Sequence, residues 1–529
     1  GYGPPLPAVP RDILDDESLF LDAGARLGAH LDDHGAEFRV FAPTAAAAAV
    51  VLYDEATGEA GRRELAMRRS GKGVWELRCD EMLEGRYYNF MITGCDLPPE
   101  VETTDIYALN AVDSSRRARL ARPDPQLGRA GADAPFRDPD FSPVDAVVWE
   151  VHVRDFSICD SSGMQSRGLY LAFAENNTSL PDAPDIKTGI EHIVELGATH
   201  VQLLPVHDYE NDELHHHYNW GYMTNLFNTP EGAYASNPQD GSRVAEMKTL
   251  VNALHERGIG VILDVVYNHT GTAAPFNLHV PRYYYRLTPD GCYSNGSGTG
   301  NEFRSEAPMA RKYIIDTLRH WVEEYDVDGF RFDLMALIDH ETMRQAEREL
   351  RRLKPSIILY GEPWQADTSP LQSPTDKHAI GDTGIGAFND DFRNAVKGDP
   401  SGGGNGFIQN GSHRFVVEHT MAGSRRLWAA SPAHSVNYLT CHDNLVLADK
   451  LAASRPDADD ELTGAMARLG YFILLTSQGV PFMHAGCEFL RTKFGDHNSY
   501  QSPDSVNRID WSLKARHRAL FDYVRGLVS

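Results

Sequence analysis

A short buried strand that ends in a carboxylate is predicted by the stretch Gly329-Phe330-Arg331-Phe332-Asp333-Leu334-Met335-Ala336-Leu337. Alternate residues of a strand face the same side, so we expect Arg331 and Asp333 to point into the same space. An arginine beside a carboxylate favours the ionised form, which a carboxylate nucleophile needs. A structural Arg–Asp pair closing the strand end explains this stretch equally well by itself.

Apolar strand-like segments alternate with helical segments over residues 141–529. Seven strands are visible in the sequence, at Asp145–Val153, Thr199–Leu204, Ile259–Val266, Gly329–Asp333, Ile357–Tyr360, Val436–Thr440 and Val480–His484, and we expect another near Ile385–Phe388. Repeated strand–helix units imply parallel strands with buried faces. Eight such units predict an α/β fold, a (β/α)8 TIM barrel whose active site lies where the strands end.

A different pattern precedes the barrel. Residues 1–22 form a lead-in, and residues 23–110 contain short alternating strands separated by turn signals, which predicts a small β-sandwich. We interpret Trp75, Tyr87 and Tyr88 there as core or edge aromatic residues rather than sugar platforms. Residues 111–140, rich in Pro and Asp, are expected to form a linker.

Composition narrows the class of partner and compartment. Lys and Arg number 50 against 75 Asp and Glu, a formal charge of -25, which argues against a nucleic acid or an anionic membrane as partner. No apolar run is long enough to span a bilayer. The six cysteines are scattered without zinc-like spacing, so free thiols in a reducing compartment are expected, and a cytoplasmic location is favoured over secretion.

Polar side chains collect where the predicted barrel strands end. Three carboxylates from three strands, Asp333, Glu362 and Asp443, are expected to meet at one barrel mouth. Buried carboxylates repel one another, so one keeps its proton while another stays ionised, which is the arrangement that glycoside hydrolysis requires. We predict no metal site. The run His215-His216-His217 fits a polar rim loop better than a metal site.

The strand ends resemble the four signature regions of the α-amylase superfamily of retaining α-glucan hydrolases. The resemblance implies Asp333 as nucleophile, Glu362 as general acid/base and Asp443 as transition-state stabiliser. It further implies a set of residues that bind the sugar or support the site: Arg331, His269, His442 and Asp264. The neighbouring residues Pro363 and Trp364 are expected to form an apolar wall beside Glu362. Such a wall raises the pKa of a carboxyl group, as acid catalysis needs.

A narrower resemblance comes from Tyr218-Asn219-Trp220-Gly221-Tyr222, which is similar to the signature of type I pullulanases, enzymes that cleave α-1,6 branch bonds. It implies that Tyr222 stacks on the glucose before the scissile bond and that Trp220 forms a pocket wall. The N-terminal sandwich resembles the carbohydrate-binding-type module that precedes many such barrels. The family usually continues with Asp-Pro where this chain has Met223-Thr224, which bears on substrate preference.

We therefore expect a debranching α-glucan hydrolase whose partner is an α-glucan polysaccharide or oligosaccharide. An isoamylase- or glycogen-debranching-type hydrolase and a branching transglycosylase share the three acids, and an inactive glucan-binding protein is the alternative outside enzymes. No cofactor is required by the resemblance, while calcium dependence and oligomeric state are left open by the sequence. Relatives continue into a C-terminal β-domain, so the sequence, which stops at Ser529, is expected to be incomplete.

Overall fold

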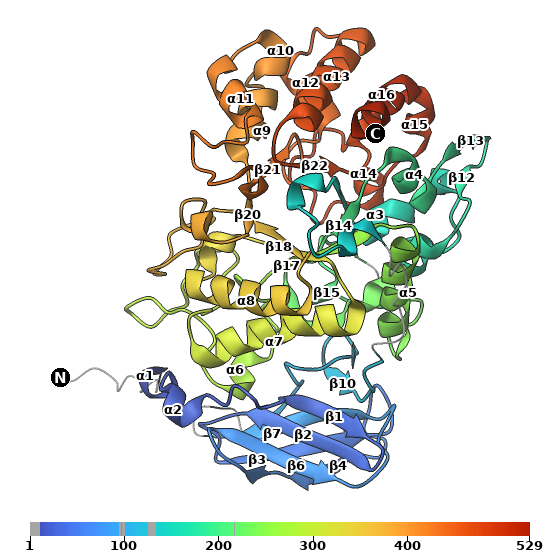
Figure 1. Ribbon diagram of the computed structural model, residues 1–529. Helices are drawn as coiled ribbons and strands as arrows, with labels where there is room; N and C mark the ends of the chain where they lie inside the picture. The colour runs from blue at the N-terminus through green and yellow to red at the C-terminus, as the bar shows by residue number, and fades with distance from the viewer. Residues whose placement is uncertain (1–10, 95–96, 98–100, 125–133, 216) are drawn as a thin grey trace, which may run out of the picture.

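The computed structural model describes residues 11–94, 97, 101–124, 134–215 and 217–529. A β-sandwich lies at one end of the molecule, a barrel occupies the middle, and the helices between residues 390 and 476 lie at the other end (Figure 1). Outside the described ranges lie residues 1–10 of the predicted lead-in, residues 95–96 and 98–100 of the predicted sandwich (including Cys95, one of the six cysteines), residues 125–133 of the predicted linker, and His216. None of the helices in the described part of the chain is long and apolar enough to cross a membrane.

The N-terminal module consists of two antiparallel sheets, with strand orders β1-β2-β6-β5 and β4-β3-β7-β10-β9, and with β8 paired to β7. The strand bounds are β1 Gly28–Asp32, β2 Gly35–Phe41, β3 Ala47–Tyr53, β4 Arg63–Ala66, β5 Arg68–Arg69, β6 Val74–Cys79, β7 Tyr87–Thr93, β8 Glu102–Thr103, β9 Ala111–Val112 and β10 Arg117–Arg119. Phe38, Val50 and Phe90 belong to a fully buried cluster that both sheets share, so hydrophobic burial holds the layers together. The predicted β-sandwich is confirmed.

The sandwich sheet extends into the stretch expected to be a linker. Strands β9 and β10 lie within residues 111–140 and pair with each other, and β10 also pairs with β7. Strands of two or three residues carry too little periodicity to be recognised in a sequence. The module also contacts the barrel directly, because the Tyr313 hydroxyl donates to the Ile106 carbonyl at 2.8 Å and the Thr229 hydroxyl donates to that of Ala108 at 2.7 Å. The domain boundaries remain a prediction.

Eight parallel strands close the barrel in the order of the sequence. Their bounds are β11 Val148–Val151, β14 His200–Leu203, β17 Gly260–Val265, β18 Gly329–Phe332, β19 Ile358–Gly361, β20 Gly386–Phe388, β21 Ser435–Tyr438 and β22 Val480–His484. The TIM-barrel prediction is confirmed, including the short strand expected near residues 385–388. Two small antiparallel pairs lie outside the barrel: β12 Ser179–Leu180 with β13 Ala183–Lys187, and β15 His207–Tyr209 with β16 Thr224–Pro230.

Helices follow the barrel strands along the chain. The longer ones are α4 Gly189–Leu196, α5 Ser242–Glu256, α7 Pro308–Tyr325, α8 His340–Leu353, α9 Asp390–Lys397, α11 Arg414–Met421, α12 Leu447–Ser454, α13 Asp460–Thr476 and α16 Arg518–Val528. The shorter ones are α1 Arg11–Leu14, α2 Glu17–Phe20, α3 Val153–Ser157, α6 Phe276–His279, α10 Phe407–Asn410, α14 Asp504–Asn507 and α15 Ser512–Arg516. Helix α8 shows how the sequence sets its ends and its buried face. Asp339 caps it by accepting the Thr342 N–H at 3.0 Å, and Met343, Ala346 and Leu350 are buried at helical spacing.

The glycine before Glu362 is required by a close approach of two barrel strands. A Cβ atom on Gly361 would lie 2.6 Å from the Phe332 carbonyl oxygen. The backbone N–H of Glu362 donates to that same oxygen at 3.0 Å. Strand β19 therefore packs against β18 at a distance that only glycine allows, and this contact sets Glu362 beside the end of the strand that carries Asp333.

Candidate active site

The guanidinium group of Arg331 is the centre of the polar cluster at the barrel mouth. Its Nη1 lies 2.9 Å from Asp264 Oδ1 and 2.8 Å from Asp333 Oδ1, and its Nη2 lies 2.8 Å from Glu362 Oε1. The Arg331 side chain is only 2% exposed. One buried cation thus holds three carboxylates from three neighbouring strands, and the pair predicted from the stretch 329–337 is part of a larger charge network.

Glu362 is placed to hold a proton near neutral pH. Burial is the largest effect on its pKa and raises it to about 7, with Asp333 and Asp443 adding to the rise and Arg331 opposing it. The backbone N–H of Leu334 donates to Glu362 Oε2 at 3.0 Å. Leu334 has a φ of 39°, a left-handed conformation that is unfavourable for leucine, and such strain is found where a fold fixes a functional geometry.

Asp333 is held from its other side by Asn268. The Asn268 side-chain amide donates to Asp333 Oδ2 at 2.7 Å and to the Asp333 carbonyl at 3.0 Å, and its carbonyl oxygen lies 2.5 Å from His269 Nδ1. Burial lowers the pKa of His269, so the ring is neutral near pH 7. Its Nε2 is buried and has no hydrogen-bond partner among the described residues.

Tyr222 and His442 form a stacked pair, with ring centroids 5.1 Å apart and planes inclined by 24°. The Tyr222 hydroxyl donates to Asp264 Oδ2 at 2.8 Å and lies 2.9 Å from His442 Nε2. The Trp220 ring meets the edge of His442 at 4.9 Å and is almost fully buried. Trp220 therefore supports the wall of the site from behind, while Tyr222 is half-buried.

Asp443 and Trp364 line a pocket of about 310 Å³ together with Arg331, Glu362, Phe388, Asp390, Arg393, Tyr438, Cys441 and Asn444. The Asp443 side chain is 44% exposed and its Oδ1 lies 3.7 Å from His442 Nε2. Asp443 is thus the accessible acid of the three, whereas Asp333 and Glu362 are 12% and 7% exposed. All ten residues predicted for the site belong to this one connected cluster, while their individual roles remain predictions.

Two polar residues of the cluster were not assigned from the sequence. Glu150 in β11 accepts hydrogen bonds from the backbone N–H and the Nδ1 of His442, and Asn268 bridges Asp333 and His269. A usable signal was present for each. Glu150 is an acid within an otherwise apolar strand, and Asn268 stands directly before a predicted site histidine.

One group of described residues has side-chain atoms close enough together to ligate a metal ion, namely Glu150, Asp264 and His442, whose candidate atoms lie within 4.8 Å of one another. Each of these side chains already has hydrogen-bond partners. Glu150 and His442 bond to each other, and Asp264 bonds to Arg331 and Tyr222. The group is therefore explained as a hydrogen-bonded relay within the site.

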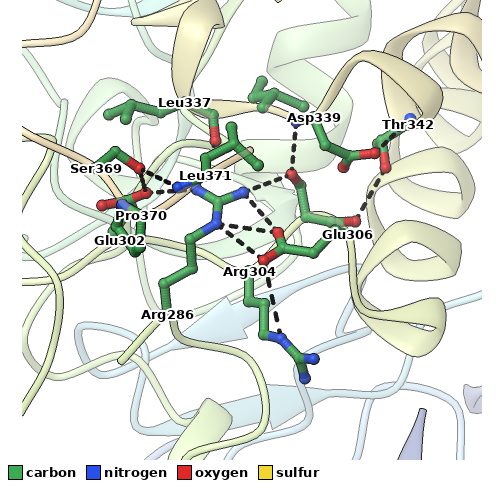
Figure 2. Close-up of polar contacts among 12 residues, drawn as sticks. Arg286, Glu302, Arg304, Glu306, Leu337, Asp339, Thr342, Ser369, Pro370 and Leu371 are labelled. Carbon is green, nitrogen blue, oxygen red and sulfur yellow. Dashed lines mark hydrogen bonds and ion pairs between the residues drawn. The ribbon is translucent and has the colours of Figure 1, made fainter. Parts of the chain in front are cut away.

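The loops that follow β17, β18 and β19 are joined by a second buried arginine, Arg286 (Figure 2). Its Nη1 donates to Glu302 Oε1 at 2.6 Å and to the Leu337 carbonyl at 2.8 Å. Glu302 also accepts hydrogen bonds from Ser294 at 2.7 Å and from Ser369. Leu337 lies four residues after Asp333 and Ser369 seven after Glu362, so this cluster fixes the loops behind both acids.

Comparison with known proteins identifies the family. The model of carbohydrate-binding module 48 (isoamylase N-terminal domain) matches residues 26–108, and that of the alpha amylase catalytic domain matches residues 173–282. The pullulanase of Bacillus subtilis (strain 168) is 40% identical over 540 residues, which cover 99% of this chain and 73% of that protein. The chain belongs to the pullulanase family. The prediction of a glycoside hydrolase of the pullulanase type is thereby confirmed.

Solved pullulanase structures share the whole fold. The pullulanase from Bacillus acidopullulyticus superposes with a TM-score of 0.93 at 40% identity, covering 98% of this chain and 64% of that one. The pullulanase from Paenibacillus barengoltzii in complex with maltohexaose and alpha-cyclodextrin superposes with a TM-score of 0.90 at 40% identity, covering 97% of this chain and 81% of that one. The chain thus spans most, but not all, of the length of these pullulanases.

Proposed function

We propose that this chain hydrolyses α-1,6 branch linkages of α-glucans such as pullulan, with retention of configuration at the anomeric carbon. In this proposal Asp333 is the nucleophile, Glu362 the general acid/base and Asp443 the transition-state stabiliser. The main support for this proposal is that one guanidinium group, that of Arg331, binds both acids: its Nη1 lies 2.8 Å from Asp333 Oδ1 and its Nη2 lies 2.8 Å from Glu362 Oε1. Two carboxyl groups on adjacent nitrogens of one guanidinium suit the short separation of about 5–5.5 Å used by retaining enzymes.

The first chemical step forms a covalent intermediate. Asp333 Oδ2 or Oδ1 attacks the anomeric carbon while the glycosidic C–O bond breaks, and Glu362 gives its proton to the departing oxygen. A pKa of about 7 keeps Glu362 protonated under mildly acidic conditions, as this step requires. Arg331 and Asn268 hold the attacking carboxylate in place before substrate arrives.

The second step releases the sugar. Glu362, now ionised, takes a proton from water, the water oxygen bonds to the anomeric carbon, and the ester bond to Asp333 breaks. Asp443, the most exposed of the three acids, supplies negative charge beside the oxocarbenium-like centre in both steps. The sum is hydrolysis of one glycosidic bond, with the proton of Glu362 restored.

The preference for α-1,6 bonds rests on family membership and on the segment from Tyr218 to Tyr222. Tyr222 stands half-buried beside Asp264 and His442, where its ring is placed to contact the sugar whose bond is cleaved. The pullulanase from Paenibacillus barengoltzii is known in complex with maltohexaose and alpha-cyclodextrin, which supports an α-glucan as the ligand class for this chain too.

Product analysis on two polymers tests the proposal. We expect maltotriose to accumulate from pullulan, because α-1,6 bonds join its maltotriose units, while amylose stays nearly intact under the same conditions. Products are sized by chromatography alongside a reducing-sugar assay. Rapid depolymerisation of amylose would sink the debranching assignment, and new branches on amylose would favour a branching transglycosylase.

A further inference from the structure

Glu150 is a fully buried acid, and both of its carboxylate oxygens contact His442. Its Oε2 accepts the backbone N–H of His442 at 2.7 Å, and its Oε1 lies 2.8 Å from His442 Nδ1. The amide of Gln202 donates to the same Oε1 at 3.2 Å, and the Tyr360 hydroxyl donates to Gln202. Because a carboxylate oxygen offers only an acceptor to the ring, His442 Nδ1 is the donor in this hydrogen bond and carries a proton.

The second nitrogen of His442 also faces acceptors. The Tyr222 hydroxyl gives its proton to Asp264 Oδ2 at 2.8 Å, so its oxygen is left to accept from His442 Nε2 at 2.9 Å. Asp443 Oδ1 lies 3.7 Å from the same nitrogen. A histidine with an acceptor at each ring nitrogen is satisfied only when both nitrogens carry protons.

The charged groups around His442 agree with this arrangement. Burial by itself lowers the pKa of the ring, but the charges of Asp443 and Glu150 outweigh burial and the repulsion from Arg331, and raise this pKa to about 9. The other titratable neighbours are His484, Tyr222 and Asp264, and burial raises the pKa of Asp264 to about 7 despite Arg331. An acid at each nitrogen therefore decides the charge of the ring.

We propose that Glu150 is a positioning residue that holds His442 as a doubly protonated imidazolium, so that the Nε2 proton fixes the Tyr222 hydroxyl and the positive ring attracts the Asp443 carboxylate. The inference rests on the proposed function only for its effect on turnover. Without that proton, the Nε2 lone pair would face the phenol oxygen, the Tyr222 hydroxyl would lose this hydrogen bond, and the Asp443 carboxylate would lose the nearby positive charge. Glu150 itself touches no substrate, because its side chain is fully buried.

The first test is the ratio of kcat of Glu150→Gln to wild type on pullulan as a function of pH. Removing the Glu150 charge and its hydrogen bond lowers the pKa of His442. At the ordinary histidine value of about 6.5, the protonated fraction is about nine-tenths at about pH 5.5 and about one-tenth at about pH 7.5. The ratio should therefore fall about tenfold between these two pH values. A ratio that does not change with pH would overturn the proposal, since a merely structural defect lowers kcat equally throughout.

Two variants control this measurement. Glu150→Asp keeps the negative charge one methylene further away and should recover part of the loss at the higher pH. Tyr360→Phe removes the hydroxyl that donates to Gln202, the side chain that in turn donates to Glu150, but it keeps the Glu150 charge, so its pH profile should match that of wild type. If Tyr360→Phe shows the same pH-dependent loss as Glu150→Gln, general disruption of the relay is the cause and the proposal fails.

The second test reads the proton directly and needs no substrate. In protein labelled with ¹⁵N-histidine, the His442 ring signals are identified by their loss in His442→Gln. Both nitrogens should be protonated in wild type at about pH 7.5, and the ring should titrate near or below about pH 6.5 in Glu150→Gln. A neutral His442 ring in wild type at that pH would overturn the proposal even if Glu150→Gln fails to fold. If pullulan is not cleaved at all, the proposed function fails while this readout still decides the charge of His442.

Discussion

Replacing Glu362 by Gln separates proton donation from every other feature of the site. The amide keeps the shape of the side chain, and its oxygen still accepts the Leu334 N–H, but its NH₂ group then faces Arg331, where the carboxylate oxygen lies at 2.8 Å. Losing one charge-assisted hydrogen bond costs about 1–3 kcal/mol. This is less than the total stability of about 5–15 kcal/mol that folded proteins have, so the variant is expected to fold.

The magnitude of the kinetic loss depends on the leaving group. General acid catalysis contributes about 10²–10⁴-fold, or about 3–5 kcal/mol of barrier. A natural dextrin needs that proton on its departing oxygen and should lose the full factor in Glu362→Gln. From an α-glucosyl fluoride the leaving group is fluoride ion, which departs without protonation. The rate of the first step on this substrate should therefore fall less than about tenfold in Glu362→Gln.

The pH dependence gives an independent check. Above about pH 7 the wild type loses the protonated form of Glu362, whose pKa is raised to about 7, so its rate on dextrins falls on the basic side. Glu362→Gln on the fluoride should lack this basic limb, because no acid remains to titrate. Rates are measured as fluoride release and as reducing sugar between about pH 5 and 9. Equal losses on both substrates, with the basic limb retained, would refute Glu362 as the acid.

Three further outcomes are expected. Asp333→Asn should fold normally but lose turnover by orders of magnitude on both dextrin and fluoride, because no covalent intermediate forms; near-normal rates would remove Asp333 from the nucleophile role. Arg331→Leu should lower the free energy of unfolding by about 3–5 kcal/mol near pH 7, because it leaves buried carboxylates without their cation. The loss should be smaller near pH 5, because carboxylates such as Asp264, whose pKa is about 7, are then protonated. An unfolding temperature shift that does not depend on pH would contradict this. Gly361→Ala should lower both the unfolding temperature and kcat, because its Cβ atom would meet a backbone oxygen at 2.6 Å; the expected loss in the free energy of unfolding is about 1–3 kcal/mol. Gly381→Ala, which has open space around its Cβ position, is the matched control and should change neither quantity.

The barrel was predictable from the sequence because its signal is local. Each of the eight strands is a buried run of three to six residues, most of them apolar, and a parallel sheet buried on both faces needs such runs. The same reasoning missed β9 and β10, which lie in the predicted linker. Strand β10 is held by pairing with β7, and β9 by pairing with β10, and strands so short leave no pattern of their own.

The active site, too, was predictable from the sequence only in part. The sequence by itself determined which polar residues stand at the strand ends, and hence that Asp333, Glu362 and Asp443 share one barrel mouth, because strand alternation and barrel geometry act over a few residues. Only the tertiary structure decided that one guanidinium binds Asp264, Asp333 and Glu362 together, and that Glu150 bonds to a histidine 292 positions away. These contacts set the charge of each group, since burial and neighbouring charges arise from segments that meet only when the barrel closes.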